Sequence, residues 1–232
     1  MKTLGDGYKA VVVGASGGIG AAIVRVLRED AFCAHVEAIS RNSHAPFDLE
    51  NENSIAALSD HLKDYLGDID LVIIATGALM VGNAGPEKAM KELDPGTMAK
   101  AFAINAIGPA LILKHFHNLL PRKRRSILAV LSARVGSIDD NRLGGWFSYR
   151  ASKAALNQVV RTAAIEIGRT RKRANCSVIH PGTVETPLTA PFAPRNAVSP
   201  DEAANNILRM LDDLTPSDTG GFFAYDGKQI AW

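Results

Sequence analysis

Short continuous runs of apolar residues alternate along the chain with longer stretches in which apolar residues recur every three or four positions. The short runs are typical of strands buried on both faces, and the longer pattern is typical of helices with one buried face. Strands are therefore expected at about 10–13, 34–40, 70–75, 126–131, 175–179 and 222–224, with a very short extra strand before Asp48. Helices are expected up to about residue 29 and over about 53–66, 96–120, 149–168 and 200–213.

The order of these elements predicts the fold class. Continuous apolar strands linked by amphipathic helices form a parallel sheet with helices on both faces. No stretch rich in Gly, Pro or Ser divides the chain, and its 232 residues suit one large domain. We therefore expect residues 1–232 to form a single, doubly wound α/β domain.

Composition and charge narrow the classes of function. The net charge is +2, so no overall field favours nucleic acid or a membrane surface as a partner. No apolar run reaches the roughly 18 residues that span a bilayer, and residues 1–9 are polar, unlike a signal peptide. Cys33 and Cys176 are far apart in sequence and have no metal-ligand spacing. We expect a cytoplasmic protein with no metal site.

A glycine-rich turn lies between the first expected strand and the first expected helix. Glycines at such a turn let the backbone approach a pyrophosphate, and the helix N-terminus offers free N–H groups and a partial positive charge. A tight turn without a ligand is the alternative. The position of the turn favours a dinucleotide site in a Rossmann fold. Its candidate cofactor contacts are Gly14, Ser16, Gly17, Gly18, Ile19 and Gly20.

The end of the second expected strand bears on which dinucleotide binds. An acidic residue there would bind a ribose 2′-hydroxyl and repel a 2′-phosphate, but the position holds Ser40. The next residue, Arg41, carries a guanidinium suited to a phosphate, and Ser16 offers a hydroxyl donor. A solvent-facing Arg41 without a ligand is the alternative. The pattern favours NADP(H) over NAD(H) as the cofactor.

Tyr149 and Lys153 lie one helical turn apart on the same face of an expected helix. A tyrosine with its ordinary pKa of about 10 is a poor base near neutrality. The lysine ammonium, together with the positive charge of oxidised nicotinamide, would stabilise the phenolate and lower that pKa. Such a pair is common on helix surfaces, but here it follows the fifth expected strand of a nucleotide-binding sheet. It is therefore the candidate catalytic core.

Together with the segments at 102–108 and 181–186, these motifs resemble the short-chain dehydrogenase/reductase family over the whole chain. The resemblance implies a seven-stranded sheet in the order 3-2-1-4-5-6-7 and a proton-relay role for Asn105. The family usually has Asn-Asn-Ala-Gly after the fourth strand, where this chain reads Ala-Thr-Gly-Ala at 75–78. A simple helix-capping role remains an alternative for Asp48. Further cofactor contacts implied by the resemblance are Asp48, Leu49, Ala75, Thr76, Gly77, Tyr149, Lys153, Pro181, Gly182, Val184 and Thr186.

One departure from the family bears on catalysis. The catalytic serine of the family is normally the second of a Ser-Ser pair at the end of the fifth strand, and here Ala133 follows Ser132. Because strand side chains alternate, Ser132 is expected to point to the other face. Ser132 is the candidate replacement if a bulge turns it inward, and Ser137 in the following loop is an alternative. Without either, the enzyme is expected to be slow.

Residues 132–138, 149–157 and 225–232 resemble the C-factor/sniffer branch of carbonyl reductases. This branch implies an NADP-dependent oxidoreductase that moves a hydride between the nicotinamide and a small carbonyl or alcohol substrate, in a homodimer or homotetramer. A loop at about 187–199 is expected to border the substrate pocket. A second interpretation, an NADP(H)-binding signalling or sensor protein with weak or lost catalysis, stays open because of Ala133. These motifs do not specify the substrate.

Overall fold

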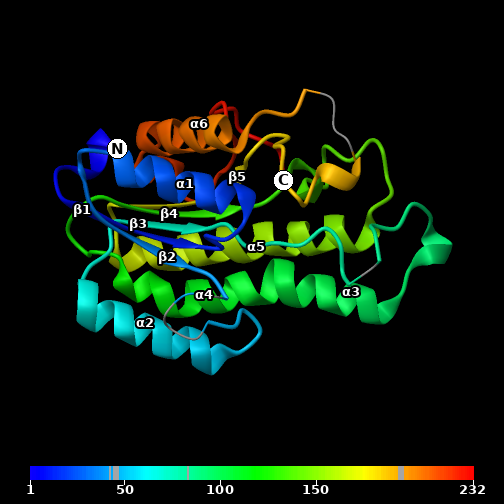
Figure 1. The fold of residues 1–232 in the computed structure, drawn as a ribbon, viewed down its shortest axis with the longest axis horizontal. Helices are drawn as coiled ribbons and strands as arrows, with labels where there is room; N and C mark the ends of the chain where they lie inside the picture. The colour runs from blue at the N-terminus through cyan, green and yellow to red at the C-terminus, as the bar shows by residue number, and fades with distance from the viewer. Residues whose placement is uncertain (42, 44–46, 83, 193–195) are drawn as a thin grey trace.

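The computed structural model describes residues 1–41, 43, 47–82, 84–192 and 196–232. Within them, six strands form one fully parallel sheet in the order β2-β1-β3-β4-β5-β6 (Figure 1). The parallel sheet expected from the sequence is thereby confirmed. The strands are β1 (Tyr8–Val13), β2 (Cys33–Ile39), β3 (Leu71–Ile74), β4 (Ser126–Leu131), β5 (Ala174–His180) and β6 (Phe222–Ala224).

Helices cover both faces of the sheet, as expected, with α1 and α6 on one side and α2, α4 and α5 on the other (Figure 1). The α-helices are α1 (Gly18–Glu29), α2 (Glu52–Leu66), α3 (Pro95–Phe102), α4 (Gly108–Phe116), α5 (Phe147–Thr170) and α6 (Pro200–Asp213). Single short turns are η1 (Lys2–Leu4), η2 (Met90–Glu92), η3 (Ala103–Ile107), η4 (His117–Leu119), η5 (Arg134–Gly136), η6 (Ala190–Phe192) and η7 (Pro216–Asp218).

Two apolar layers bury the sheet. Val11 and Val13 of β1 belong to the layer formed with α2, α4 and α5, whereas Val12 belongs to the layer formed with α1 and α6. All three side chains are fully buried. This arrangement explains why the strands read as continuous apolar runs, because both faces of each strand are withdrawn from water.

The strand count differs from the seven expected. The missing strand is the short one placed before Asp48, where residues 44–46 lie outside the described part of the chain and Phe47 and Asp48 are not in a strand. Phe47 is instead buried against the core through its side chain. The order of the six remaining strands is the expected order with the third strand left out.

Side-chain caps mark where several helices begin. The Asn51 side chain accepts a hydrogen bond from the Asn53 amide (3.0 Å) at the start of α2, and Ser199 accepts one from the Glu202 amide (3.2 Å) at the start of α6. Short polar side chains are preferred at this position because they satisfy amides that the helix leaves unpaired. The helix start expected around residue 199 is thus confirmed.

The helical region expected at 96–120 is interrupted. Helices α3 and α4 are joined by η3, a π-helical turn. By length and composition alone, the stretch Pro95–Leu119 could cross a membrane. Helices in protein cores pass the same test, and here α3 and α4 pack on α5 and α4 also packs on α2. Lys100 and Lys114 on this stretch form ion pairs with Glu50 and Glu52.

Candidate active site

The carboxyl ends of the strands border a cavity of about 620 Å³. Its walls come from the turn after β1, the segment after β3, the end of β4, the start of α5 and the loop after β5. Ligands bind at this edge of open parallel sheets, because the loops that follow the strands meet there. The cavity is therefore the candidate active site.

The glycine turn is shaped for a phosphate group. Gly14 has a φ angle of +92°, and a Cβ atom there would lie 2.8 Å from the carbonyl carbon of Ala75. A Cβ atom at Gly18 would lie 2.7 Å from Cγ2 of Thr186. Helix α1 begins at Gly18 with no side-chain cap. A backbone cradle and an uncapped helix N-terminus fit the pyrophosphate of a dinucleotide.

Tyr149 and Lys153 lie at the start of α5 and line the cavity together. Lys153 Nζ lies 6.0 Å from the centroid of the Tyr149 ring and donates a hydrogen bond to the carbonyl oxygen of Leu131 (3.2 Å). Only 3% of Lys153 is exposed. The ammonium group is therefore held against the end of β4, beside the phenol ring.

Burial dominates the acid–base properties of this pair. It raises the pKa of Tyr149 to about 12 and lowers the pKa of Lys153 to about 8, because water no longer stabilises either charged form. In the protein alone, the pKa of Tyr149 is therefore raised. The sequence led us to expect a lowered pKa in the complex with oxidised nicotinamide. Burial is the cause of the raised pKa, and within the described residues no hydrogen bond joins the ammonium to the phenol to offset it. At neutral pH Tyr149 therefore keeps its proton.

Asn105 lies in the π-helical turn and is completely buried. Its side chain accepts a hydrogen bond from the Ala78 amide (2.8 Å) and donates to the Ala78 carbonyl (2.9 Å) and to Ser152 Oγ (3.2 Å). Ser152 in turn donates to the carbonyl oxygen of Tyr149 (2.9 Å). Asn105 thus ties the segment after β3 to the helix that carries Tyr149. Its proton-relay role stays a prediction.

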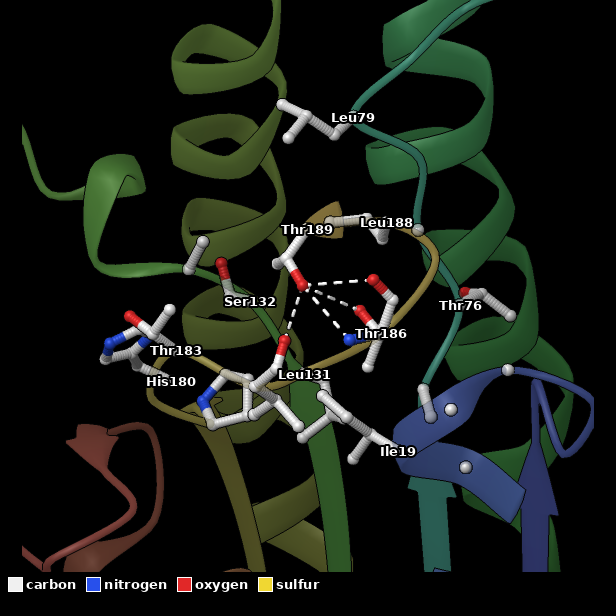
Figure 2. Close-up of a pocket in the computed structure, with 18 of the residues that line it drawn as sticks. Ile19, Thr76, Leu79, Leu131, Ser132, His180, Thr183, Thr186, Leu188 and Thr189 are labelled. Carbon is white, nitrogen blue, oxygen red and sulfur yellow. Dashed lines mark hydrogen bonds between the residues drawn. The ribbon is translucent and has the colours of Figure 1, made fainter. Parts of the chain in front are cut away.

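The hydroxyl groups near Ala133 are engaged elsewhere. Ser132 lines the cavity (Figure 2), but its hydroxyl donates to Asn157 Oδ1 at 2.7 Å. Ser137 donates to the Trp232 carbonyl (3.3 Å) and accepts from the Asp140 amide (3.0 Å). Ser137 is not among the residues that line the cavity. Neither serine offers its proton to the cavity in this structure.

The loop after β5 is braced by two threonines, shown in Figure 2. Thr189 Oγ1 donates to the Val184 carbonyl (2.5 Å) and accepts from the Thr186 amide (3.1 Å). The hydroxyl groups of Thr186 and Thr189 lie 3.2 Å apart. These bonds hold Thr186 against Gly18, at the start of α1. The loop and the glycine turn therefore form one continuous wall.

The structure gathers most of the predicted cofactor contacts around this cavity. Those that line it are Ser16, Gly17, Gly18, Ile19, Gly20, Arg41, Ala75, Thr76, Gly77, Tyr149, Lys153, Pro181, Gly182, Val184 and Thr186. Gly14, Asp48 and Leu49 do not line it. The Asp48 carboxylate accepts from the Glu50 amide (2.9 Å), and Leu49 packs against Gly108.

Aromatic side chains form the outer part of the cavity. Trp146 and Phe192 both line it, with ring centroids 5.2 Å apart. Of the loop expected at 187–199, residues 187–189 and 192 line the cavity, and residues 193–195 lie outside the described part of the chain. This part of the cavity is thus apolar.

Two side chains at the site were not selected by the motif analysis. Glu87 is buried and accepts hydrogen bonds from the amide (3.1 Å) and hydroxyl of Ser148. Burial acts to raise the pKa of Glu87, but the bonds from Ser148 outweigh it and hold that pKa below its ordinary value. His180 lines the cavity at the end of β5. Its place at the carboxyl end of a parallel strand was the signal that marks it as a candidate.

A family model described as enoyl-(acyl carrier protein) reductase matches residues 14–227. This match includes the glycine turn, the tyrosine–lysine pair and the loop after β5. The chain belongs to the short-chain dehydrogenase/reductase family. The expected membership is thereby confirmed, and the family's fold accounts for the site lying at the carboxyl edge of the sheet.

Two curated relatives match this chain over nearly the whole of their own length. The C-signal of Myxococcus xanthus is 36% identical over 168 residues, covering 68% of this short-chain dehydrogenase/reductase and 96% of the relative. The 1-hydroxy-2-glutathionyl-2-methyl-3-butene dehydrogenase of Rhodococcus sp. (strain AD45) is 29% identical over 232 residues, covering 96% of this chain and 98% of the relative.

Solved carbonyl reductases share the fold. The NADPH-bound carbonyl reductase from chicken fatty liver matches with a TM-score of 0.84 and 23% identity, over 98% of this chain and 95% of that chain. The carbonyl reductase Sniffer of D. melanogaster matches with a TM-score of 0.86 and 20% identity, over 98% and 100% of the two chains. The match to the C-signal confirms the expected resemblance to the C-factor side of that branch, and the match to Sniffer shows a shared fold.

Proposed function

We propose that this short-chain dehydrogenase/reductase is an NADP(H)-dependent oxidoreductase that moves a hydride between the nicotinamide and a small carbonyl or alcohol substrate. The observation that carries the proposal is the pair of half-buried Tyr149 and buried Lys153, which faces the same cavity as the uncapped start of α1. One cavity thus combines a dinucleotide cradle with a proton donor. The outer aromatic wall suits a substrate with an apolar portion.

Tyr149, Lys153 and Asn105 have different roles in this proposal. The nicotinamide supplies or accepts the hydride when it is bound. Tyr149 holds the proton that the substrate oxygen receives during reduction, since the raised pKa keeps its phenol neutral. Lys153 contributes a positive charge beside the ring below its pKa of about 8. Asn105 fixes the backbone next to both groups.

The preference for NADP(H) rests on Arg41. Its side chain is exposed, lines the cavity next to the glycine turn and forms no ion pair with another described residue. A guanidinium free of a carboxylate is suited to bind a ribose 2′-phosphate. The carbonyl reductase from chicken fatty liver, which shares the fold, was solved with NADPH bound.

The signalling or sensor interpretation is weaker. A protein that only senses a nucleotide has no need for a buried lysine next to a tyrosine, because burying an ammonium group costs free energy. The pair is present and complete in this chain. Assembly into a homodimer or homotetramer stays a prediction.

The test combines nucleotide binding with turnover. Binding of NADPH and NADH is measured by fluorescence, and NADPH oxidation is then followed with a panel of ketones, aldehydes and quinones. Tyr149→Phe should lower kcat by roughly 10²–10⁴-fold while NADPH still binds, because the phenol proton is lost and the cavity is retained. Arg41→Ala should weaken NADPH binding about tenfold or more and leave NADH binding nearly unchanged.

The outcomes separate the parts of the proposal. Binding of NADPH with no turnover dependent on Tyr149 contradicts the oxidoreductase function. Equal affinity for both nucleotides in the wild-type protein contradicts only the NADP(H) preference. A chain that binds neither nucleotide contradicts both.

A further inference from the structure

Among the described residues, the hydroxyl groups next to Ala133 offer no evident donor that could polarise a substrate carbonyl. Ala133 has no hydroxyl, and the protons of Ser132 and Ser137 are committed to Asn157 Oδ1 and to the Trp232 carbonyl. Thr186 and Thr189 are bonded to each other. Thr76 lies across the cavity, on the side of Ile19 (Figure 2). None of these five hydroxyl groups directs its proton at the end of β4. Thr183 also lines the cavity, and a variant at that position serves as a control in the test below.

His180 is the last residue of β5, the strand paired with β4. The register pairs Leu131 with Ile179, and the Ser132 amide donates to the Ile179 carbonyl (2.7 Å). His180 therefore stands level with Ser132, one residue before the level of Ala133, on a strand about 4.8 Å away. Figure 2 shows its imidazole on the same side of the cavity as Ser132. An imidazole is longer than a hydroxymethyl group, and His180 and Ala133 line the same cavity.

The surroundings of His180 determine which nitrogen carries the proton. Nδ1 is buried and has no hydrogen-bond partner among the described residues, whereas Nε2 is not one of the buried atoms that lack a partner. Burial and the nearby Arg134 lower the pKa of His180 to about 4, against the opposing effect of Asp226. The ring is therefore neutral at physiological pH. An N–H at Nδ1 would have no acceptor, so the proton belongs on Nε2.

We propose that His180 donates a hydrogen bond from Nε2 to the substrate oxygen and replaces the hydroxyl donor that is absent at Ala133. The inference rests on the proposed oxidoreductase function and adds a catalytic residue to it. A neutral imidazole can polarise a carbonyl without transferring its proton. His180 keeps its proton throughout, while the oxygen receives a proton from Tyr149 and the carbonyl carbon receives the hydride.

A matched pair of variants tests the donor. His180→Met removes the N–H and keeps a long side chain, whereas His180→Gln keeps an N–H donor near the place of Nε2. Loss of such a donor lowers kcat by roughly 10²–10³-fold. We expect that loss in His180→Met, a much smaller loss in His180→Gln, and unchanged NADPH affinity in both. Thermal unfolding of the variants checks that the fold is retained.

A double-mutant cycle distinguishes a catalytic role of His180 from a structural one. Ala133→Ser restores a hydroxyl at the position where the family has its catalytic serine. Combined with His180→Met, it should recover a large part of the lost kcat, because either donor can serve the same oxygen. A purely structural role of His180 would not be rescued in this way.

The tautomer can be read without turnover. Long-range ¹⁵N–¹H spectra of the ring nitrogens should show a neutral His180 protonated at Nε2 at pH 7. The signals are assigned by their loss in His180→Met, since the chain has 6 histidines. A ring protonated at Nδ1, or at both nitrogens, would overturn the inference.

The kinetic outcomes distinguish the inference from the function it rests on. If Tyr149→Phe abolishes turnover while His180→Met does not lower it, the His180 inference fails and the oxidoreductase function stands. The inference also fails if Thr183→Val, which alters a neighbouring hydroxyl, gives the loss in place of His180→Met. If Tyr149→Phe leaves turnover unchanged, the proposed function itself fails.

Discussion

The two ends of the sheet treat positive charges differently. At the amino ends of the strands, Lys9 and Arg124 remain partly or fully exposed and donate hydrogen bonds to acceptors there. At the carboxyl ends, Lys153 is buried. Asp70 accepts from Arg124 Nε (2.6 Å) and from the Lys9 amide (3.1 Å), and Lys9 Nζ donates to the Leu66 carbonyl. Lys153 also donates to a carbonyl, that of Leu131, but it is buried. No carboxylate pairs with it among the described residues.

This difference separates charges that support the fold from a charge that costs stability. At the amino ends, an ion pair raises the pKa of Arg124, mainly through the hydrogen bond to Asp70. At the carboxyl ends, burial alone lowers the pKa of Lys153. A group stabilised by its partners belongs to the architecture, and a strained, unpaired charge in a cleft is typical of a functional site. Substitutions at the two ends should therefore have opposite effects.

The largest effect is expected from Lys153→Met. It should lower kcat at least a hundredfold and raise the free energy of unfolding at pH 7 by up to about 3 kcal/mol, because a buried charge is removed. In the wild-type protein the folded state binds fewer protons than the unfolded state between pH 8 and 10.5. Stability from this group therefore increases as the pH rises through that range. Denaturant unfolding at pH 7 and pH 9 measures the change in stability and its pH dependence, and steady-state kinetics measures kcat.

Lys9→Met is the matched control at the other end. It removes a hydrogen bond from a lysine to a carbonyl and should lower the free energy of unfolding by about 1 kcal/mol, with kcat retained. The comparison fails if both lysine variants shift stability in the same direction.

After Lys153→Met, the next effect in size is expected from Asp70→Asn. Asp70 is 3% exposed and serves Arg124 and the Lys9 amide at once, so weakening it should cost about 1–3 kcal/mol of stability. Turnover and NADPH affinity should not change. Asp68→Asn, at an exposed ion pair of the same end, should cost less than about 1 kcal/mol. A marked fall in kcat for Asp70→Asn would show that the two ends are coupled.

The smallest effect is expected from replacing Arg122 and Lys123 together by alanine. Both are exposed at the amino ends, and their loss should change stability by no more than about 0.5 kcal/mol. NADPH affinity measured by titration should stay at the wild-type value, in contrast to Arg41→Ala. A large fall in NADPH affinity would mean that the cofactor is attracted by the charge of the whole molecule and not by one arginine.

The sequence predicted the fold well where periodicity was strong. The runs at 70–75 and 126–131 became central strands because both faces of each are covered by helices. The strand expected before Asp48 was very short, and Phe47 there packs by its side chain and not by strand pairing. The π-helical turn at Asn105 had no sequence signal, since its geometry depends on side-chain bonds to Ala78 and Ser152.

The site was predicted unevenly for a physical reason. The positions of Gly14, Tyr149 and Lys153 follow from local spacing, which a sequence displays directly. The acid–base state of Tyr149 depends on how much water the complete fold excludes, and spacing carries no such information. Likewise, the lowered pKa of His180 arises from burial in the complete fold, with smaller effects from Arg134 and Asp226, which are distant from it in sequence.

The first amides of helix α5 are bonded by a residue from another part of the chain, Glu87. Trp146 precedes it in the left-handed conformation and supplies no side-chain cap, so Glu87 receives the amide of Ser148 and the carbonyl of Glu87 receives that of Trp146 (2.5 Å). The first turn of α5 is therefore ordered only while the segment around Glu87 is docked. Local opening of that segment would free the amides next to Tyr149 for hydrogen exchange while the sheet remains protected.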